Sequence, residues 1–337
     1  MIENYIVITS INDLTPGIIS FSEQQKWHTI VVGDLKSPPL EKTPINNVTF
    51  LSTTTQHELQ FHAHELMPYN HYCRKNLGYL YAIRMGAKWI GDTDDDNIPY
   101  DEKWGDNALE GTSKPKEITA PKFVNIYSLY TDKHVWPRGF PLDRILSKEK
   151  VVVSQQRGLD VPNVLIWQGL ADNDPDVDAI YRLTVGELLN FNKSGTFVLS
   201  NGVYTPFNSQ NTIWKYEAFP YLYLPVTVTF RFTDILRGYV AQRGLQAMGG
   251  QLGFTNATVY QERNEHKLLA DFESELPCYM QIEHVVDLLE SVTLTGDYRV
   301  DLPSMYAHLA KNDIVAAAEL DAIDAWVTDL INLGFSG

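Results

Sequence analysis

Short apolar runs alternate with amphipathic segments along the first part of the chain. Residues 4–10 (NYIVITS) and 28–34 (HTIVVGD) are β-branched runs that end in small or polar residues, so each predicts a strand. Residues 15–25 lie between them and predict a helix, with Pro16 in its first turn. This β-α-β order predicts a parallel sheet with ligand-binding groups at the carboxyl ends of its strands.

The next elements lead to an acidic loop. Residues 46–52 predict a third strand, and residues 70–87 predict a helix in which apolar residues recur at helical spacing until Gly86 ends it. Residues 88–91 (KWIG) predict a further strand. The aspartates that follow therefore leave the carboxyl edge of a parallel sheet, where open α/β sheets place their chemistry.

The rest of the chain changes from strands to helices. Further strands, some of them antiparallel, are predicted at residues 117–131, 151–156, 163–169, 195–202, 224–232 and 257–264. Residues 233–250 predict a helix with an apolar stripe, and the chain is mostly helical from residue 266 onward. We therefore predict an α/β catalytic domain over residues 1–280 and a C-terminal helical extension over residues 281–337.

Composition limits the partners of this fold. The 337 residues carry 42 acidic and 27 basic side chains, a formal net charge of −15. Such a chain is a poor general binder of nucleic acid or anionic membranes, which need clustered Lys and Arg. No signal-peptide pattern and no bilayer-length apolar run is present, and the two cysteines suggest no disulfide framework. A cytoplasmic protein without a transmembrane segment is expected, with its oligomeric state left open.

The acidic loop lies in residues 88–101, KWIGDTDDDNIPYD, and holds Asp92, Asp94, Asp95 and Asp96. One interpretation is a solvated acidic surface, which is common for a run of charge. The other is a divalent cation site, because Asp94 and Asp96 straddle one residue and can face one ion from an extended loop. Hard oxygen ligands favour Mg²⁺ or Mn²⁺. A calcium EF-hand is a poor alternative, because the loop lacks the Gly and the distal Glu of that motif.

Several ordered blocks resemble a known family. RKNLGYLYAIRMGAKWIGDTDDDNIPYD is similar to the segment around the DxD motif of GT-A-fold nucleotide-sugar glycosyltransferases, especially the STELLO-type proteins. The resemblance continues through WHTIVVGDLKSP, QGLADNDPDVDAIYRLT, TPFNSQNTIW, FRFTDILRGYVAQRGL and QERNEHKLLADFESE, and it covers residues 4–280. The triple aspartate and FTDIL also resemble, more distantly, the reversibly glycosylated polypeptides, which act as UDP-arabinopyranose mutases.

This resemblance implies a fold, a cofactor and a reaction. The fold is a GT-A, Rossmann-like mixed sheet flanked by helices, with the C-terminal helical cap. Asp94 and Asp96 would hold Mn²⁺ or Mg²⁺ against the two phosphates of a nucleotide sugar, with a UDP-sugar as the expected donor, and His266 would add a third ligand. The partners implied are this donor and a glycan or other hydroxyl acceptor. For His266, an ordinary residue at a helix start is the competing interpretation.

The resemblance also assigns the other site residues. Thr9 and Asp34 would meet the base and ribose, while Lys36, Arg74 and Lys75 would offer positive charge to the diphosphate. The remaining nucleotide- or sugar-binding candidates are Asp95, Asp174, Asn208 and Gln210. Loop capping, solvated basic side chains and surface turns are the competing interpretations.

Asp234 is the catalytic candidate. It lies in the first turn of the helix predicted at residues 233–250, and FTDIL resembles the block in which GT-A enzymes carry an acidic residue that faces the sugar. There it would do acid–base work on the acceptor side. The competing interpretation is a charge that complements the helix dipole. Two functions compete with a glycosyltransferase: a sugar-nucleotide mutase, and a non-catalytic GT-A-fold partner in a larger assembly.

Overall fold

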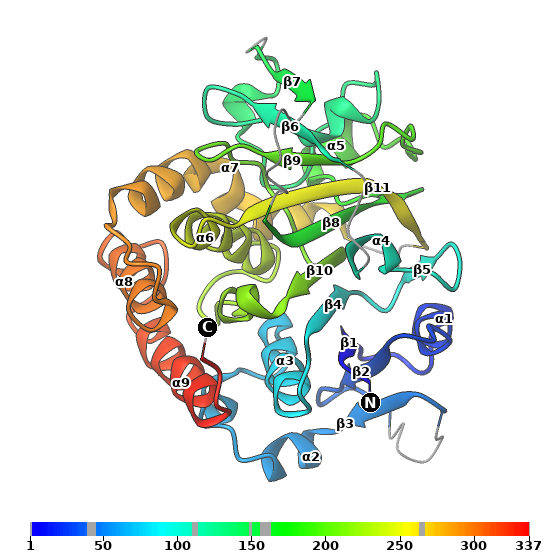
Figure 1. Ribbon diagram of the computed structural model, residues 1–337, viewed down its shortest axis with the longest axis vertical. Helices are drawn as coiled ribbons and strands as arrows, with labels where there is room; N and C mark the ends of the chain where they lie inside the picture. Colours follow the sequence, from blue (N-terminus) through cyan, green and yellow to red (C-terminus); the bar gives the residue numbers. More distant parts are fainter. Residues whose placement is uncertain are drawn as a thin grey trace.

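One large sheet organises the molecule. The computed structural model describes residues 2–38, 45–109, 114–147, 150–155, 163–262 and 267–336. Within these residues an 11-stranded mixed sheet runs through the molecule in the order β3-β2-β1-β4-β10-β8-β11-β9-β6-β7, with β5 paired to β11 (Figure 1). The strands are β1 (Asn4–Thr9), β2 (His28–Val32), β3 (Val48–Leu51), β4 (Trp89–Thr93), β5 (Asn97–Pro99), β6 (Lys116–Thr119), β7 (Val152–Gln155), β8 (Val164–Asp172), β9 (Phe197–Leu199), β10 (Asn211–Lys215) and β11 (Gln251–Gln261).

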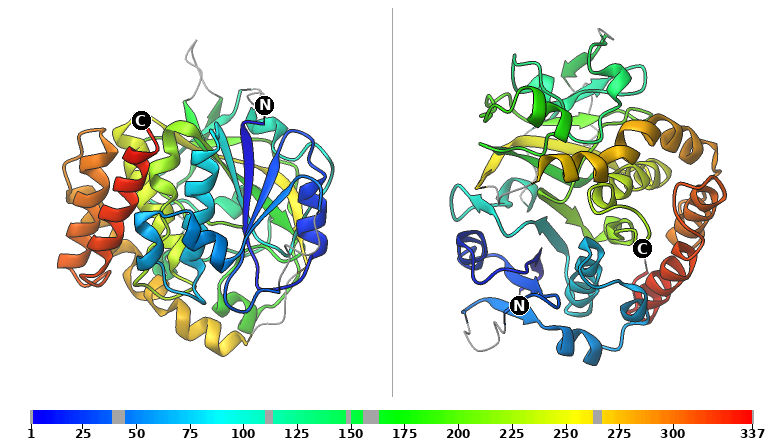
Figure 2. Two further views of the ribbon diagram at one scale, coloured as in Figure 1. Left: turned by 90° about the horizontal axis from the view of Figure 1, so that it is seen from below. Right: turned by 180° about the vertical axis from the view of Figure 1, so that it is seen from behind.

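Helices cover both faces of this sheet (Figure 2). The α-helices are α1 (Pro16–Ser22), α2 (Thr53–Glu58), α3 (Lys75–Arg84), α4 (Asp106–Leu109), α5 (Ala179–Thr184), α6 (Thr233–Ala247), α7 (Leu268–Ser291), α8 (Tyr298–Lys311) and α9 (Glu319–Asn332). The 3₁₀ helices are η2 (His62–Leu66), η3 (Tyr72–Arg74), η4 (Ile126–Leu129), η5 (Leu142–Arg144) and η6 (Tyr216–Leu222). This mixed sheet with helices on both sides confirms the predicted GT-A-like α/β fold.

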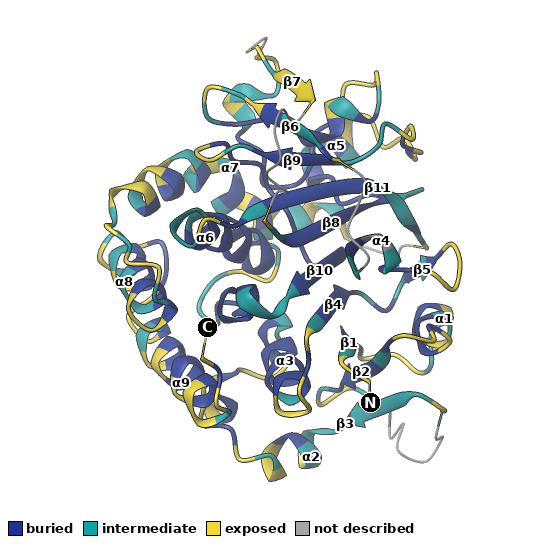
Figure 3. Cartoon of the chain, in the orientation of Figure 1, coloured by how far each residue is buried: buried dark blue, intermediate teal, exposed yellow. Residues whose placement is uncertain are grey.

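The first strand, β1, shows why helices pack on both faces of the sheet. Successive side chains of β1 point to opposite faces of the sheet. Ile6 and Ile8 pack with Phe21 of α1, whereas Tyr5 and Val7 belong to the larger core on the α3 and α6 side. A strand buried on both faces needs apolar residues at every buried position, which is why residues 5–8 (YIVI) form a continuous apolar run. In Figure 3 the central strands are buried, and the outer sides of α8 and α9 are exposed.

The strand directions bring several loops to one edge. β1, β2 and β4 are parallel, so their carboxyl ends lie together. β10 is antiparallel to both β4 and β8, so the residues before β10 and those after β8 reach the same edge. β11 is parallel to β8 and ends there as well. The chemistry-bearing loops of the sequence therefore converge.

Two strand predictions in the middle of the chain were wrong or incomplete. Residues 224–232 form no strand, although they alternate β-branched and aromatic residues. Backbone N–H groups of Val226 and Thr227 donate instead to the carboxylate of Glu319 in α9, at 2.9 Å each, so tertiary contacts override the local preference. The strand β10 was not predicted, and the predicted strand at residues 117–131 is β6 followed by η4.

The C-terminal helices pack against the rest of the molecule rather than standing apart from it. α7 begins at Leu268 and continues to Ser291, so position 280 falls within a helix. The carboxylate of Asp329 in α9 accepts hydrogen bonds from the backbone N–H groups of His62 and Ala63, both at 2.9 Å. The division into domains at residue 280 stays a prediction. In the described part of the chain, no helix combines the length and the apolar character needed to cross a membrane.

Candidate functional site

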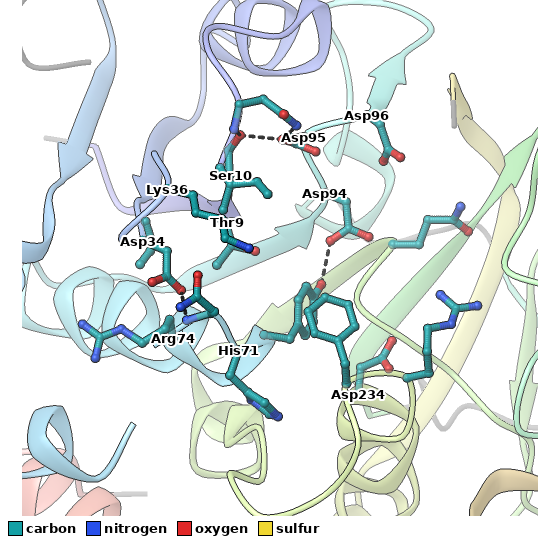
Figure 4. Close-up of a pocket in the computed structure, with 18 of the residues that line it drawn as sticks. Thr9, Ser10, Asp34, Lys36, His71, Arg74, Asp94, Asp95, Asp96 and Asp234 are labelled. Atoms are coloured by element: carbon teal, nitrogen blue, oxygen red, sulfur yellow. Dashed lines mark hydrogen bonds between the residues drawn. The ribbon is translucent and has the colours of Figure 1, made fainter. Parts of the chain in front are cut away.

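A cavity of about 570 Å³ opens at the carboxyl edge of the sheet. Its walls come from the loops after β1, β2 and β4, from residues 70–74, and from the segment that enters α6. The residues lining it include Thr9, Asp34, Lys36, Arg74, Asp94, Asp95, Asp96, Gln210 and Asp234. These are nine of the predicted site residues, drawn from distant parts of the sequence. In Figure 4, Thr9, Asp34 and Lys36 lie to the left of Asp94, and Asp234 lies below it.

Two of the four clustered aspartates make contacts that hold the fold together, although Asp95 also lines the cavity and its predicted role in ligand binding stays a prediction. Asp92 is fully buried between Lys75 and Arg237, at 2.7 Å from each. Burial alone would raise the pKa of Asp92, but these two cations hold it below its usual value. Asp95 accepts hydrogen bonds from the side chains of Ser10 and Asn12, so its carboxylate fixes the loop after β1.

Asp94 and Asp96 line the cavity (Figure 4). Asp94 accepts a 2.6 Å hydrogen bond from the hydroxyl of Tyr72 and lies 3.5 Å from the ammonium of Lys75. Burial, together with repulsion from Asp96 and Asp92, raises the pKa of Asp94 to about 7, against the opposing effect of Lys75 and Tyr72. Asp96 accepts a 3.0 Å hydrogen bond from the side chain of Gln261. Two carboxylates that repel each other in a cavity are a donor set suited to a hard divalent cation.

The third predicted metal ligand cannot be placed. His266 lies outside the described residues. Among the residues that the structure does describe, no group of three or more His, Cys, Asp or Glu side chains converges on one point. The role of His266 stays a prediction.

The predicted nucleoside end of the cavity is held by backbone contacts. The two carboxylate oxygens of Asp34 accept from the backbone N–H groups of Leu35 and Asn70, both at 2.7 Å. Asp34 thereby ties the loop after β2 to the segment that enters η3. Thr9 ends β1 beside it, and Lys36 is exposed at the rim.

Arg74 and Lys75 contribute less to the cavity than the sequence suggested. The guanidinium of Arg74 donates to the carbonyl of Met67 at 2.9 Å and to Gln56, and it stacks 4.3 Å over the ring of Tyr69. Lys75 is fully buried behind Asp94, where it neutralises Asp92. These contacts make both cations structural supports, and diphosphate binding by either one stays an untested prediction.

Of the predicted sugar-binding residues, some line the cavity and others form contacts within the fold. Gln210 lines the cavity and donates 2.7 Å to Gln261, which in turn donates to Asp96. Asn208 is buried beneath it and donates 2.7 Å to Asp176. Asp174 pairs with Arg182. Only Gln210 of these three predicted residues is among the cavity-lining side chains.

Asp234 lies in an ionic network at the cavity wall formed by the segment that enters α6. Its two oxygens accept from the guanidinium of Arg138 at 3.1 and 2.9 Å. The same guanidinium binds Asp176, and together with Arg231 it holds the pKa of Asp176 down at about 2, against the opposing effect of burial. Asp234 is therefore fixed in orientation by a cation with two carboxylate partners.

Sequence reasoning missed several cavity residues. Tyr72, Arg138, Arg231 and Gln261 all line the cavity or bind its carboxylates. Arg231 stands three residues before Asp234, so its position near the site could have been predicted from the sequence. Arg138 lies 96 positions from Asp234, in a segment with no recognisable motif, and only the tertiary fold brings it in.

Comparisons with known proteins agree with the family resemblance. No protein-family model matches the chain. The chain is 28% identical over 353 aligned residues to Probable glycosyltransferase STELLO1 of Arabidopsis thaliana, and 28% identical over 359 to Probable glycosyltransferase STELLO2 of the same plant. Each match covers 99% of this chain and 45% of the relative, so the chain spans about half the length of these curated relatives. The similarity to STELLO-type proteins is thus confirmed, and it extends through the C-terminal helices.

Proposed function

We propose that this chain, similar to the STELLO-type glycosyltransferases along its whole length, transfers a sugar from a nucleotide-diphosphate sugar to a hydroxyl acceptor in a metal-dependent reaction. A UDP-sugar is the donor we expect. The observation that carries the proposal is the pair Asp94 and Asp96 in a cavity of about 570 Å³ at the carboxyl edge of the sheet. That volume lies within the range of small-molecule sites.

The roles of the residues follow from their places in the cavity. Asp94 and Asp96 would hold Mn²⁺ or Mg²⁺, which when bound supplies positive charge to a leaving diphosphate. Tyr72 and Gln261 orient these two carboxylates through their hydrogen bonds. Thr9, Asp34 and Lys36 would receive the nucleoside on one side of the metal site.

Asp234 would act on the opposite side, toward the acceptor. Because Arg138 holds both of its oxygens, Asp234 presents its carboxylate in one orientation. In an inverting reaction this carboxylate would take the proton of the acceptor hydroxyl, and in a retaining reaction it would position the acceptor.

Metal-dependent nucleotide binding tests the proposal. UDP should raise the melting temperature of the wild-type protein in Mn²⁺ and far less in chelator, through mass action on the folded state. Asp94→Asn and Asp96→Asn should each remove this difference. Asp101→Asn is the matched control, since Asp101 is exposed on the same acidic segment and outside the cavity lining, and it should behave as wild type. Metal-dependent UDP binding that survives in both Asp94→Asn and Asp96→Asn would overturn the metal assignment.

Product analysis separates the competing functions. Incubation with UDP-sugars and Mn²⁺ but no acceptor should leave the sugar nucleotide unisomerised, whereas a mutase would convert it to an isomer. A non-catalytic partner would bind without forming any product in the presence of an acceptor panel.

A further inference from the structure

The segment that enters α6 places an aromatic ring in the charged cavity. Residues 224–232, which we call the 224–232 loop, connect η6 to α6 and contribute Phe230 and Arg231 to the cavity lining. Phe230 is 52% exposed. A large flat side chain that lines a cavity and stays half open to solvent provides apolar contact area for a ligand.

Two C-terminal helices fix the loop on either side of this ring. On one side, Glu319 of α9 accepts from the backbone of Val226 and Thr227 at 2.9 Å each. On the other side, the hydroxyl of Thr229 donates 2.6 Å to the carbonyl of Ser274 in α7, and the backbone N–H of Arg231 donates 3.2 Å to the hydroxyl of Ser274. The backbone on both sides of Phe230 is therefore held in place, which lowers the entropy cost of a ligand contact with the ring.

The ring also lies close to the proposed metal site. Its centroid is 5.5 Å from that of Tyr72, whose hydroxyl donates to Asp94, and 6.4 Å from that of His71. Both neighbours meet Phe230 edge to face. In Figure 4, Thr9 and Asp34 of the proposed nucleoside end lie to the left of Asp94, Asp234 lies below it, and the 224–232 loop leads directly into Asp234. A group that stacks on Phe230 would thus lie on the acceptor side.

The charges around the ring are already compensated. Arg231 lies 2.7 Å from Glu275 and 3.7 Å from Asp176. Arg138 binds Asp176 and Asp234. An anionic ligand would have to compete with these carboxylates for both cations, so a neutral ligand fits this wall better.

We propose that Phe230 is the stacking face for a neutral pyranose ring of the acceptor, held in place by α7 and α9. This inference rests on the proposed glycosyltransferase function. The apolar C–H face of a sugar ring would lie on the open part of Phe230, and its hydroxyl would point toward Asp234. The C-terminal helices thereby gain a role in acceptor selection.

Binding measured in two stages tests this inference. UDP with Mn²⁺ is titrated first, and methyl glycosides of glucose, galactose, mannose and xylose are then followed by saturation-transfer NMR on the complex with UDP and diamagnetic Mg²⁺. Phe230→Ala should weaken the best glycoside roughly tenfold, the size typical of one aromatic contact, with the UDP affinity within about twofold of wild type. Phe230→Tyr should keep the glycoside affinity. Tyr100→Ala is the matched control, because Tyr100 is 53% exposed and outside the cavity lining.

The possible results distinguish a failure of the proposed stacking on Phe230 from a failure of the proposed function. Unchanged glycoside binding in Phe230→Ala, or no glycoside binding by the wild type, overturns the proposed stacking. A loss of UDP affinity in Phe230→Ala places the base on the ring instead and also overturns it. Methyl glucuronide is added as an anionic comparison. If it binds more tightly than the neutral glycosides, the assignment of a neutral acceptor sugar is wrong. Failure of wild-type protein to bind UDP with Mn²⁺ appears in the first stage and counts against the proposed function itself.

Discussion

The carboxylate of Glu319 offers a quantitative test of how the C-terminal helices support the site. Glu319 is fully buried at the start of α9. One of its oxygens accepts from the hydroxyl of Tyr223 at 2.6 Å and from the N–H of Val226 at 2.9 Å, and the other accepts from the N–H and hydroxyl of Thr227 at 2.9 and 2.6 Å. Glu319→Gln keeps the shape of the side chain and replaces one accepting oxygen with a donor.

The expected cost follows from this geometry. A glutamine retains one pair of hydrogen bonds, and its NH₂ group then faces the N–H of Thr227, which loses its partner. Two hydrogen bonds to a charged group are lost at about 1.5 kcal/mol or more each, so the free energy of unfolding should fall by about 3 kcal/mol. The favourable position of an acid in the first turn of α9 adds a few tenths of a kcal/mol.

Urea unfolding of matched variants measures this cost. Glu290→Gln is the control, since Glu290 is also a glutamate in a C-terminal helix but forms a surface ion pair of 2.7 Å with Lys122. Its effect should stay below about 1 kcal/mol. If Glu319→Gln is no more destabilising than Glu290→Gln, the helix α9 does not hold the 224–232 loop in the way described.

Three further outcomes are expected. Asp234→Asn should lower turnover roughly a hundredfold or more, which is the contribution of a general base, while UDP affinity in Mn²⁺ stays nearly unchanged. If the variant keeps wild-type turnover and only its melting temperature falls, Asp234 serves to complement the dipole of α6 and does no acid–base work. Asp95→Asn should lower the free energy of unfolding by about 1–2 kcal/mol, because the loop after β1 is held less firmly, yet keep metal-dependent UDP binding, unlike Asp94→Asn. Burial raises the pKa of Asp178 from 3.8 to about 6, so the folded state binds the extra proton and the wild type should lose stability as pH rises from about 4 to 6. Between these pH values the free energy of unfolding of the wild type should fall by roughly 2–3 kcal/mol more than that of Asp178→Asn. Parallel curves of unfolding free energy against pH for the two proteins would contradict this assignment.

The parts of the fold that the sequence predicted are those with strong local patterns. β1, α1, β2, β3, α3 and β4 each lie where a local apolar run and its flanking turn residues predicted an element, and α6 and the C-terminal helices do the same. The strand ends then placed Thr9, Asp34 and Asp94 on one edge by the rule for parallel sheets alone. Local pattern and tertiary arrangement agree in this half of the molecule.

The parts that failed depend on partners far away in the sequence. The 224–232 loop has the residues of a strand, but the carboxylate of Glu319 takes up its backbone donors. β10 covers only Asn211–Lys215 and is preceded by polar residues, so its central place between β4 and β8 has little local signal. The same applies to Lys75, whose burial against Asp92 depends on how α3 packs on the sheet.

The aspartates at this edge of the sheet differ in what neutralises them, and this contrast supports the proposed metal site. Asp92 meets Lys75 and Arg237 at 2.7 Å each, and Asp176 meets Arg138, also at 2.7 Å; both carboxyl groups have lowered pKa values although they are buried. Asp94 shares Lys75 with Asp92 at the longer distance of 3.5 Å, and burial raises its pKa to about 7. Keeping such a carboxylate ionised costs the folded protein stability. A divalent cation between Asp94 and Asp96 would offset that cost, so the instability of the metal-free site is the expected counterpart of its affinity for the metal.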